Sequence, residues 1–224
     1  MRHTVMPSQA LRFYFDYLSP YSYLAWQEIP ALAQRHDLQL EPKPVLLAAL
    51  LDHHGHKGPG EIPPKRAYAF KDCVRRAATL GVPFEPPFSH PFNPLPALRV
   101  TMLDMDEERR LELITRLFRA TWAEARDVSS PEVVGAICNE VGVPNAIQRV
   151  QDPVVKQRLK EATTEAIELG VFGVPTMLIG RELFWGTDSF QYFENHLAGQ
   201  DPVSTTDLRA WDAVWASAVR ARSR

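Results

Sequence analysis

The stretch FDYLSPYSYLA occupies residues 15–25, and it decides how the chain begins to fold. Apolar and polar side chains alternate over residues 11–15, a pattern typical of a β-strand. Ser19 then stands at the expected N-cap of a helix, and Pro20 at the first helical position, where a missing N–H costs nothing. The stretch therefore predicts a strand that turns directly into a helix at Ser19.

Helical patterns dominate the middle of the chain. The helix that starts at Pro20 is expected to kink or split at Pro30, and residues 38–45 predict a second strand. Apolar residues then recur at three- and four-residue spacing, which predicts helices over 66–80, 106–126, 131–141 and 154–169. Loops rich in proline and glycine separate them at 55–64 and 82–96, and long loops of this kind are more often functional than idle.

Strand patterns return towards the C-terminal end. Residues 176–179 and 182–185 predict two strands joined by a tight Gly180-Arg181 turn, and Asp188 is expected to cap a final helix. The elements follow the order β-α-β, a helical block, then β-β-α. This order predicts an α/β protein with a thioredoxin-like fold interrupted by a large all-helical insertion.

The predicted elements divide the chain into three parts. Residues 10–48 and 168–200 are expected to form the thioredoxin-like domain, residues 49–167 the helical insertion domain, and residues 201–224 a C-terminal tail. In the tail, one face of a short amphipathic helix would carry Leu208, Trp211, Trp215 and Ala218. Docking of this face on its own domain is favoured over docking on a second subunit.

The composition excludes several classes of function. The formal net charge is −2 and no basic cluster occurs, so a nucleic-acid partner is not expected. No apolar stretch of about 20 residues could span a membrane, and a cytoplasmic location is the simplest prediction. Cys73 and Cys138 are far apart and belong to no C-x-x-C pair, which argues against a disulfide framework or a zinc site.

Two short motifs lie where a thioredoxin-like fold places thiol chemistry. Ser19-Pro20-Tyr21-Ser22 opens the first helix, where thioredoxin-like proteins carry a C-x-x-C motif. Val174-Pro175 precedes the third strand, where a cis-proline faces that motif. Dithiol–disulfide exchange requires a nucleophilic thiolate from the protein, and both cysteines are serines here. Dithiol oxidoreductase activity is therefore excluded at this position.

The remaining chemistry suits a thiol that arrives with a ligand. A helix N-terminus presents free N–H groups and the positive end of the dipole, and the Ser19 hydroxyl can donate to a thiolate there. Thiol pKa values fall from about 8.5 to well below neutral in such surroundings, and glutathione is the abundant candidate. A cis Val174–Pro175 bond would expose backbone groups to the cysteinyl part of this tripeptide, as in strand addition. Trp185-Gly186-Thr187-Asp188 offers a hydroxyl, an acid and N–H groups to its γ-glutamyl end.

Four blocks carry a resemblance to a known family: FDYLSPYSYLA (15–25), GPGEIPPKRAYAFKD (58–72), HPFNPLPALR (90–99) and GVFGVPTMLIGRELFWGTD (170–188). They resemble 2-hydroxychromene-2-carboxylate isomerases and the related kappa-class glutathione transferases, over about residues 11–198. The resemblance implies a thioredoxin-like fold with an all-helical insertion, glutathione as cofactor and a homodimer.

The resemblance also implies roles for single residues. Ser19 would be the catalytic serine that contacts the glutathione sulfur, and Val174 the backbone partner before Pro175. The γ-glutamyl end would be held by Trp185, Gly186, Thr187 and Asp188. The implied reaction interconverts a cyclic hemiketal and an open-chain benzylidene pyruvate of an aromatic substrate. The thiolate adds to the conjugated double bond, permits rotation and leaves.

The sequence departs from the family at several positions. His56 aligns where an asparagine often contacts glutathione, and it would keep a hydrogen bond while adding a titratable group. Ser189 stands where an arginine commonly follows the aspartate. The family's contacts to the aromatic acid have no clear match over residues 50–60. Lys65 and Asn93, in the two proline-rich loops, are therefore the candidates for contacts to an anionic substrate.

Simpler roles and other functions compete with this assignment. Ser19 could be only a helix cap, and Trp185 only a core residue. The cluster of His53, His54 and His56 is expected to be an exposed loop, not a metal site. Glutathione-dependent isomerisation of 2-hydroxychromene-2-carboxylate-type compounds is the leading function. A kappa-type transferase that conjugates glutathione to electrophiles, and a non-catalytic thiol-peptide binder related to disulfide oxidoreductases, are the alternatives.

Overall fold

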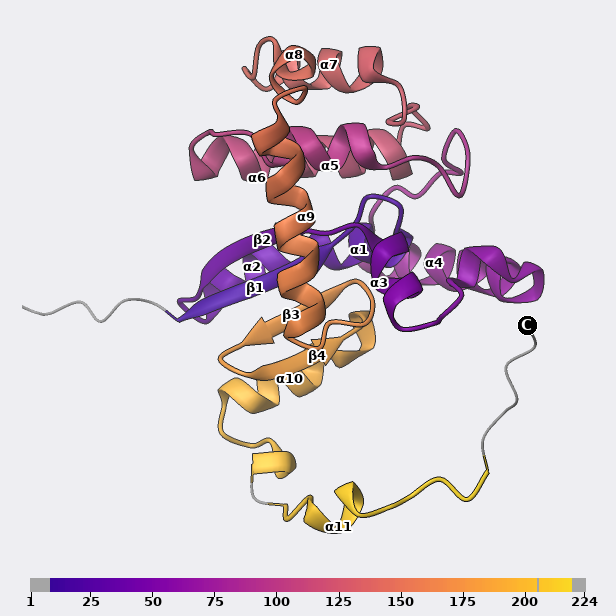
Figure 1. Cartoon of the computed structure of the whole chain (residues 1–224), viewed down its shortest axis with the longest axis vertical. Helices are drawn as coiled ribbons and strands as arrows, with labels where there is room; N and C mark the ends of the chain where they lie inside the picture. Colours follow the sequence, from indigo (N-terminus) through magenta and orange to yellow (C-terminus); the bar gives the residue numbers. More distant parts are fainter. Residues whose placement is uncertain (1–8, 205, 219–224) are drawn as a thin grey trace, which may run out of the picture. The chain divides into compact units, whose positions relative to one another are not determined.

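The structure is a computed structural model that describes residues 9–204 and 206–218 (Figure 1). The chain divides into two compact units, Met1–Asp188 and Ser189–Arg224. The first unit contains the sheet and the helices inserted into it. In the described part of the chain, no helix combines the length and the apolar content needed to cross a membrane.

A mixed sheet of four strands forms the centre of the first unit. The strands have the order β2-β1-β3-β4 and are β1 (Ala10–Phe15), β2 (Gln39–Pro44), β3 (Thr176–Ile179) and β4 (Glu182–Trp185). β1 and β2 are parallel, whereas β3 is antiparallel to both β1 and β4. The thioredoxin-like fold predicted from the element order is confirmed, and β3 and β4 have the predicted bounds.

The register brings four strand ends to one edge of the sheet. Phe15 pairs with Pro44, Tyr14 pairs with Thr176, and Thr176 pairs with Trp185. The carboxyl ends of β1, β2 and β4 therefore lie beside the amino end of β3. Segments that are far apart in the sequence meet at this edge, which we call the active edge.

The helix after β1 splits as predicted. α1 (Pro20–Trp26) ends before α2 (Ile29–Arg35) begins, and Pro30 lies in the first turn of α2. Proline is tolerated there because the first helical turn has no internal partner for its N–H groups.

Seven α-helices of the described chain lie between β2 and β3: α3 (Leu47–His53), α4 (Pro63–Leu80), α5 (Leu95–Thr101), α6 (Glu107–Trp122), α7 (Pro131–Glu140), α8 (Ala146–Arg149) and α9 (Pro153–Glu168). In Figure 1, α5 and α6 lie between the sheet and the pair α7 and α8, and α9 runs back to the sheet. The sequence predicts the four long helices and misses α3, α5 and α8. Each missed helix has seven or fewer residues, too few for a clear apolar period.

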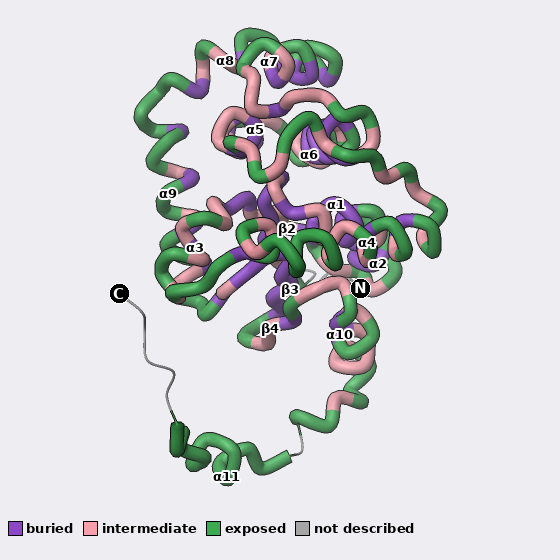
Figure 2. Tube along the Cα trace, turned by 90° about the vertical axis from the view of Figure 1, so that its right-hand side faces the viewer, coloured by how far each residue is buried: buried purple, intermediate pink, exposed green. Residues whose placement is uncertain are grey.

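An aromatic cluster joins the insertion to the sheet. Phe118 of α6 is fully buried, and its ring lies between 4.8 and 6.3 Å, centroid to centroid, from the rings of Phe15, Tyr17, Tyr23 and Trp26. Aromatic pairs at these separations add to the stabilisation from apolar burial. Figure 2 shows that buried residues also follow the strands and one side of α6. The insertion is therefore packed onto the sheet through a continuous core.

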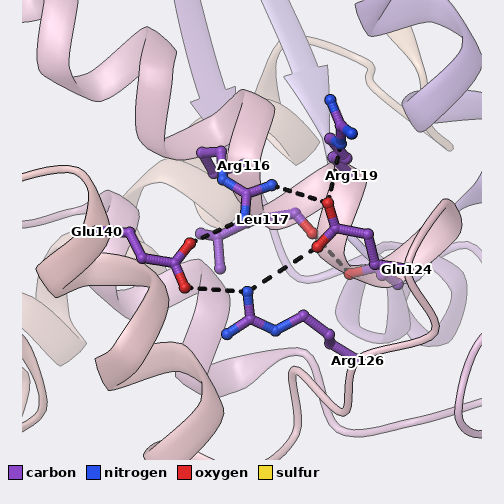
Figure 3. A network of polar contacts seen from close by, with 7 residues as sticks. Arg116, Leu117, Arg119, Glu124, Arg126 and Glu140 are labelled. Carbon is purple, nitrogen blue, oxygen red and sulfur yellow. Dashed lines mark hydrogen bonds and ion pairs between the residues drawn. The ribbon is translucent and has the colours of Figure 1, made fainter.

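A partly exposed charge network connects α6 to α7 (Figure 3). Arg116 contacts Glu124 at 3.2 Å and Glu140 of α7 at 2.8 Å, and Arg126 contacts Glu140 at 3.2 Å. These side chains are 27–44% exposed, so water screens them and each pair contributes only about 0–1 kcal/mol. Apolar packing stabilises the insertion more than this network does.

The second unit contains α10 (Phe190–Leu197), a 3₁₀ turn at Pro202–Ser204 and α11 (Arg209–Asp212). The N-cap residue of α10 is Ser189, so the prediction that Asp188 caps the last helix is wrong. A 3₁₀ turn, Thr187–Ser189, delays the start of the helix and leaves Asp188 inside that turn. The α-helix in the described tail covers only Arg209–Asp212, so the predicted amphipathic helix is wrong for Trp215 and Ala218, which lie after its end; residues 219–224 lie outside the described part.

Candidate functional site

Ser19 caps α1 and keeps a hydroxyl hydrogen to donate. Its Oγ accepts the N–H of Ser22 at 3.1 Å, and its own N–H donates to the Asp16 carbonyl at 3.0 Å. The cap uses an oxygen lone pair, so the hydroxyl hydrogen can point to a ligand. Ser19 is only 5% exposed, which reduces the competition from water for that hydrogen bond. The roles of helix cap and thiolate donor are therefore compatible.

The helical insertion holds the turn that precedes α1. Trp122 of α6 donates its indole N–H to the Tyr17 carbonyl at 2.9 Å, and His90 Nε2 lies 3.2 Å from the Leu18 carbonyl. The Tyr17 hydroxyl is hydrogen-bonded to Thr101 Oγ1 of α5 at 2.7 Å. The insertion thus fixes the backbone directly before the α1 N-terminus, in addition to covering the sheet.

Asp16 is a fully buried acid in the same turn. Its Oδ1 accepts the N–H of Leu18 at 3.0 Å, and its Oδ2 accepts the N–H of Leu47 at 2.9 Å. Burial raises the pKa of Asp16 to about 7, although the two hydrogen bonds act to lower it. Asp16 connects the turn before α1 to the start of α3, a role that the sequence did not indicate.

Val174 presents unpaired backbone groups at the active edge. The Val174–Pro175 peptide bond is cis, as predicted. Continuing the antiparallel pairing of β1 with β3 places Val174 opposite Asp16, close to the α1 N-terminus. Among the described residues, no hydrogen bond reaches the backbone of Val174, whereas the Pro175 carbonyl accepts the N–H of Gly186 at 2.9 Å. A peptide backbone can pair with Val174 as an added strand does.

The end of β4 and the residues that follow it pack against the cis-proline loop (residues 171–175). The Trp185 indole lies over Gly173, where an added Cβ would be 2.9 Å from its Nε1, and its ring is 5.1 Å from that of Phe172. Trp185 is nevertheless 53% exposed, so it is not a core residue. Gly186 has a φ of +87°, and a Cβ there would lie 2.6 Å from Asp188 Oδ1. Glycine at this position therefore leaves room for the Asp188 carboxylate.

The structure gives less support for the other predicted site residues, which are His56, Lys65 and Asn93. His56 is exposed after α3, and the neighbouring His54 contacts the backbone of the cis-proline loop at 3.3 Å. Lys65 is exposed in the first turn of α4. The side-chain oxygen of Asn93 accepts the N–H of Leu95 at 3.1 Å, which favours a turn-forming role. Their contacts to ligands stay predictions.

The cysteine thiols of the chain are not available for chemistry at the active edge. Cys73 and Cys138 are buried, and burial raises the pKa of each thiol to about 12. A thiolate beside Ser19 must therefore come from a ligand. Within the described residues, no group of three His, Cys, Asp or Glu side chains is arranged to hold a metal ion.

Comparison with known proteins assigns the chain to a family. The sequence profile of the DSBA-like thioredoxin domain matches residues 10–198. The chain belongs to this family. In this DSBA-like domain the two serines of the α1 turn occupy the C-x-x-C positions, so membership of the family does not restore dithiol exchange.

Relatives of the DSBA-like domain include isomerases and transferases. The 2-hydroxychromene-2-carboxylate isomerase of Sphingobium xenophagum is 28% identical over 194 residues, covering 85% of this chain and 98% of that protein. Glutathione S-transferase kappa 1 of Homo sapiens is 25% identical over 210 residues, covering 86% and 92%. A solved structure of a 2-hydroxychromene-2-carboxylate isomerase matches with a TM-score of 0.78 at 26% identity, covering 88% of this chain and 100% of that one. The resemblance carried by the four sequence blocks is confirmed.

Two side chains at the active edge of the DSBA-like domain, those of His90 and Arg76, were not predicted from the sequence. His90, in the second proline-rich loop, packs against Gly60 of the first, where an added Cβ would lie 2.8 Å from its ring. The His90 ring centroid is also 5.3 Å from that of Phe70 in α4. Arg76 of α4 donates to Thr187 Oγ1 at 2.9 Å. The HPFNP segment is visible in the sequence, but nothing in the sequence predicts either contact.

Hollows elsewhere in the DSBA-like domain do not involve the predicted site residues. A cavity of about 310 Å³ lies between the end of β2 and helices α5, α6 and α9, and charged side chains line much of it. None of the predicted site residues lines this cavity. The candidate site is therefore defined by the functional groups that meet at the active edge.

Proposed function

We propose that this protein is a glutathione-dependent isomerase of 2-hydroxychromene-2-carboxylate-type aromatic compounds. One observation carries the proposal: Ser19, with a hydroxyl hydrogen to donate, and Val174, whose backbone has no hydrogen bond to the described residues, lie at the same edge of the sheet. The chain offers no thiolate of its own there, since both cysteines are buried elsewhere. The names of the relatives support glutathione and isomerisation as the chemistry.

The residues at the active edge fit the parts of glutathione. Ser19 would donate to the sulfur, and the N–H of Tyr21 and the positive end of the α1 dipole would favour its negative charge. Val174 would pair with the cysteinyl backbone. Thr187 and Asp188 would bind the γ-glutamyl end, and no hydrogen bond reaches the exposed Asp188 carboxylate within the described chain. When bound, glutathione would supply the nucleophilic sulfur that adds reversibly to a conjugated double bond.

Other side chains are proposed to complete the site. Trp185 and Gly186 would shape the pocket of the γ-glutamyl group, and His56 would hydrogen-bond to glutathione from the loop after α3. Lys65 and Asn93 would contact the anionic aromatic substrate, with Asn93 using its NH₂ group because its oxygen is engaged in a turn. A homodimer and a cytoplasmic location also remain proposals from the sequence.

A glutathione transferase is the second candidate, because kappa-class relatives match the chain over a similar length. Both reactions need the same stabilised thiolate. In the isomerisation the sulfur leaves again, whereas in the conjugation it stays attached to the product. A non-catalytic thiol-peptide binder would use the same contacts without turnover.

Turnover assays separate the three candidates. With catalytic glutathione and a 2-hydroxychromene-2-carboxylate, we expect isomerisation with no loss of free thiol. S-methylglutathione, which lacks an ionisable thiol, is the matched ligand control and should support no reaction. Steady conjugation of glutathione to a chlorinated nitrobenzene without isomerisation would instead identify a transferase. Glutathione binding without either reaction would identify a binder.

A further inference from the structure

A cation from the helical insertion reaches the segment after β4. Arg76 of α4 donates from Nη1 to Thr187 Oγ1 at 2.9 Å, across 111 residues of sequence. Asp188 is next in the chain; the pKa of Arg76 is raised mainly by its hydrogen bond to Asp72, and the negative charge of Asp188 adds to this effect. The residue that follows is Ser189, so the chain has no cation of its own directly after this acid.

The guanidinium of Arg76 is held in place on several sides. Its Nε donates to Asp72 Oδ2 at 2.7 Å, and its Cζ lies 5.9 Å from the centroid of the Tyr21 ring. Asp72 Oδ2 also accepts the Tyr21 hydroxyl at 3.0 Å. Burial acts to raise the pKa of Asp72, but the hydrogen bonds from Arg76 and Tyr21 outweigh it and lower that pKa. Asp72 therefore remains a carboxylate that orients the arginine.

The Nη2 group of Arg76 remains available to a ligand. Nε and Nη1 are engaged, whereas Nη2 donates no hydrogen bond within the described residues, and the Arg76 side chain is 35% exposed. Thr187 accepts from Arg76, so its hydroxyl hydrogen is free to donate in turn. Arg76 Nη2 and Thr187 Oγ1 thus offer two donors to one anion, and Asp188 offers an acceptor beside them.

We propose that Arg76 binds the α-carboxylate of the γ-glutamyl group, with the Thr187 hydroxyl as second donor and the Asp188 carboxylate receiving the α-ammonium. This assignment rests on the proposed function. The arrangement of one fixed guanidinium, one hydroxyl and one carboxylate is complementary to an α-amino acid zwitterion. Because Tyr21 belongs to the α1 turn, the Tyr21–Asp72–Arg76 chain also sets the distance between this subsite and Ser19.

Calorimetry with two ligands tests the assignment. Glutathione is compared with γ-aminobutyryl-cysteinylglycine, which lacks only the α-carboxylate. The unmodified protein should bind glutathione about 10- to 100-fold more tightly than the analogue, the range for a charge-assisted hydrogen bond. In Arg76→Met the two ligands should bind within about threefold of each other, and Arg76→Lys should keep part of the preference.

Arg75→Met is the matched control. Arg75 is the exposed neighbour on the same helix, so its loss removes an equal charge and should leave the preference unchanged. If Arg76 had only a structural role, Arg76→Met would weaken the binding of both ligands equally and keep the preference for glutathione. That result would overturn the assignment of Arg76 but not the proposed function. Absence of glutathione binding by the unmodified protein would overturn the proposed function and the assignment together.

Discussion

Ser19→Ala is expected to lower the rate of the glutathione-dependent reaction by about 10²–10³-fold, the usual cost of losing one well-placed donor to a developing anion. The Ser19 hydroxyl is buried at the α1 N-terminus, and its oxygen accepts the Ser22 N–H, so its hydrogen can point to the sulfur. Steady-state kinetics with saturating glutathione measures the effect. A rate within about threefold of the unmodified protein would remove Ser19 from the mechanism.

Two further variants separate the donor role of Ser19 from its cap role. Ser22→Ala is the matched control, because the Ser22 hydroxyl is buried with no hydrogen-bond partner among the described residues. In Ser22→Ala the backbone N–H of residue 22 still donates to Ser19 Oγ and completes the helix cap, so activity should change little. Ser19→Asp retains a good N-cap but places a carboxylate beside the sulfur, and it should lose at least as much activity as Ser19→Ala. Recovery of activity in Ser19→Asp would show that the cap alone matters.

Asp16→Asn is expected to remove a large pH dependence of folding stability. The pKa of Asp16 is raised to about 7 in the fold, mainly by burial, whereas the same group in an unfolded chain has a pKa near 3.8. Between these values the folded protein keeps a proton that the unfolded chain releases, so the Asp16 contribution to stability is largest below pH 4 and is lost as the pH rises to about 7. At 1.36 kcal/mol for each factor of ten, the loss is on the order of 4 kcal/mol.

Urea unfolding of both proteins between pH 4 and pH 8 measures this contribution. Other carboxyl groups titrate in both proteins, so the difference in unfolding free energy isolates Asp16. The asparagine NH₂ would meet one of the two N–H groups, of Leu18 or Leu47, with a donor, which costs a further ~1–3 kcal/mol at every pH. The pH-dependent part should still disappear. A free-energy difference that is flat from pH 4 to pH 8 would contradict a raised pKa for Asp16.

Local patterns predicted the parts of the fold that depend on neighbouring residues. Strand alternation before Ser19, the proline at the start of α1 and the Gly180-Arg181 turn all act within a few residues, and the structure has each of them. The cis peptide bond before Pro175 followed from its place in the order of elements. The sequence therefore identified both sides of the active edge before any contact was known.

The missed features depend on packing between distant segments. Arg76 and Thr187 are separated by 111 residues, and no periodicity in the sequence reports that α4 passes the end of β4. His90 gains its position from the two proline-rich loops, which have no regular pattern. The error at Asp188 has a different cause, because an acid before an apolar run favours a cap equally well whether or not a 3₁₀ turn intervenes.

The central claim is that a glutathione sulfur is ionised at the start of α1. Titration of bound glutathione by the ultraviolet absorbance of its thiolate, with S-methylglutathione as the blank, measures this ionisation directly. The thiol pKa should lie well below the ordinary value of about 8.5 in the unmodified protein and should be higher in Ser19→Ala. A bound thiol that titrates like free glutathione, with the same pKa in both proteins, would contradict the claim.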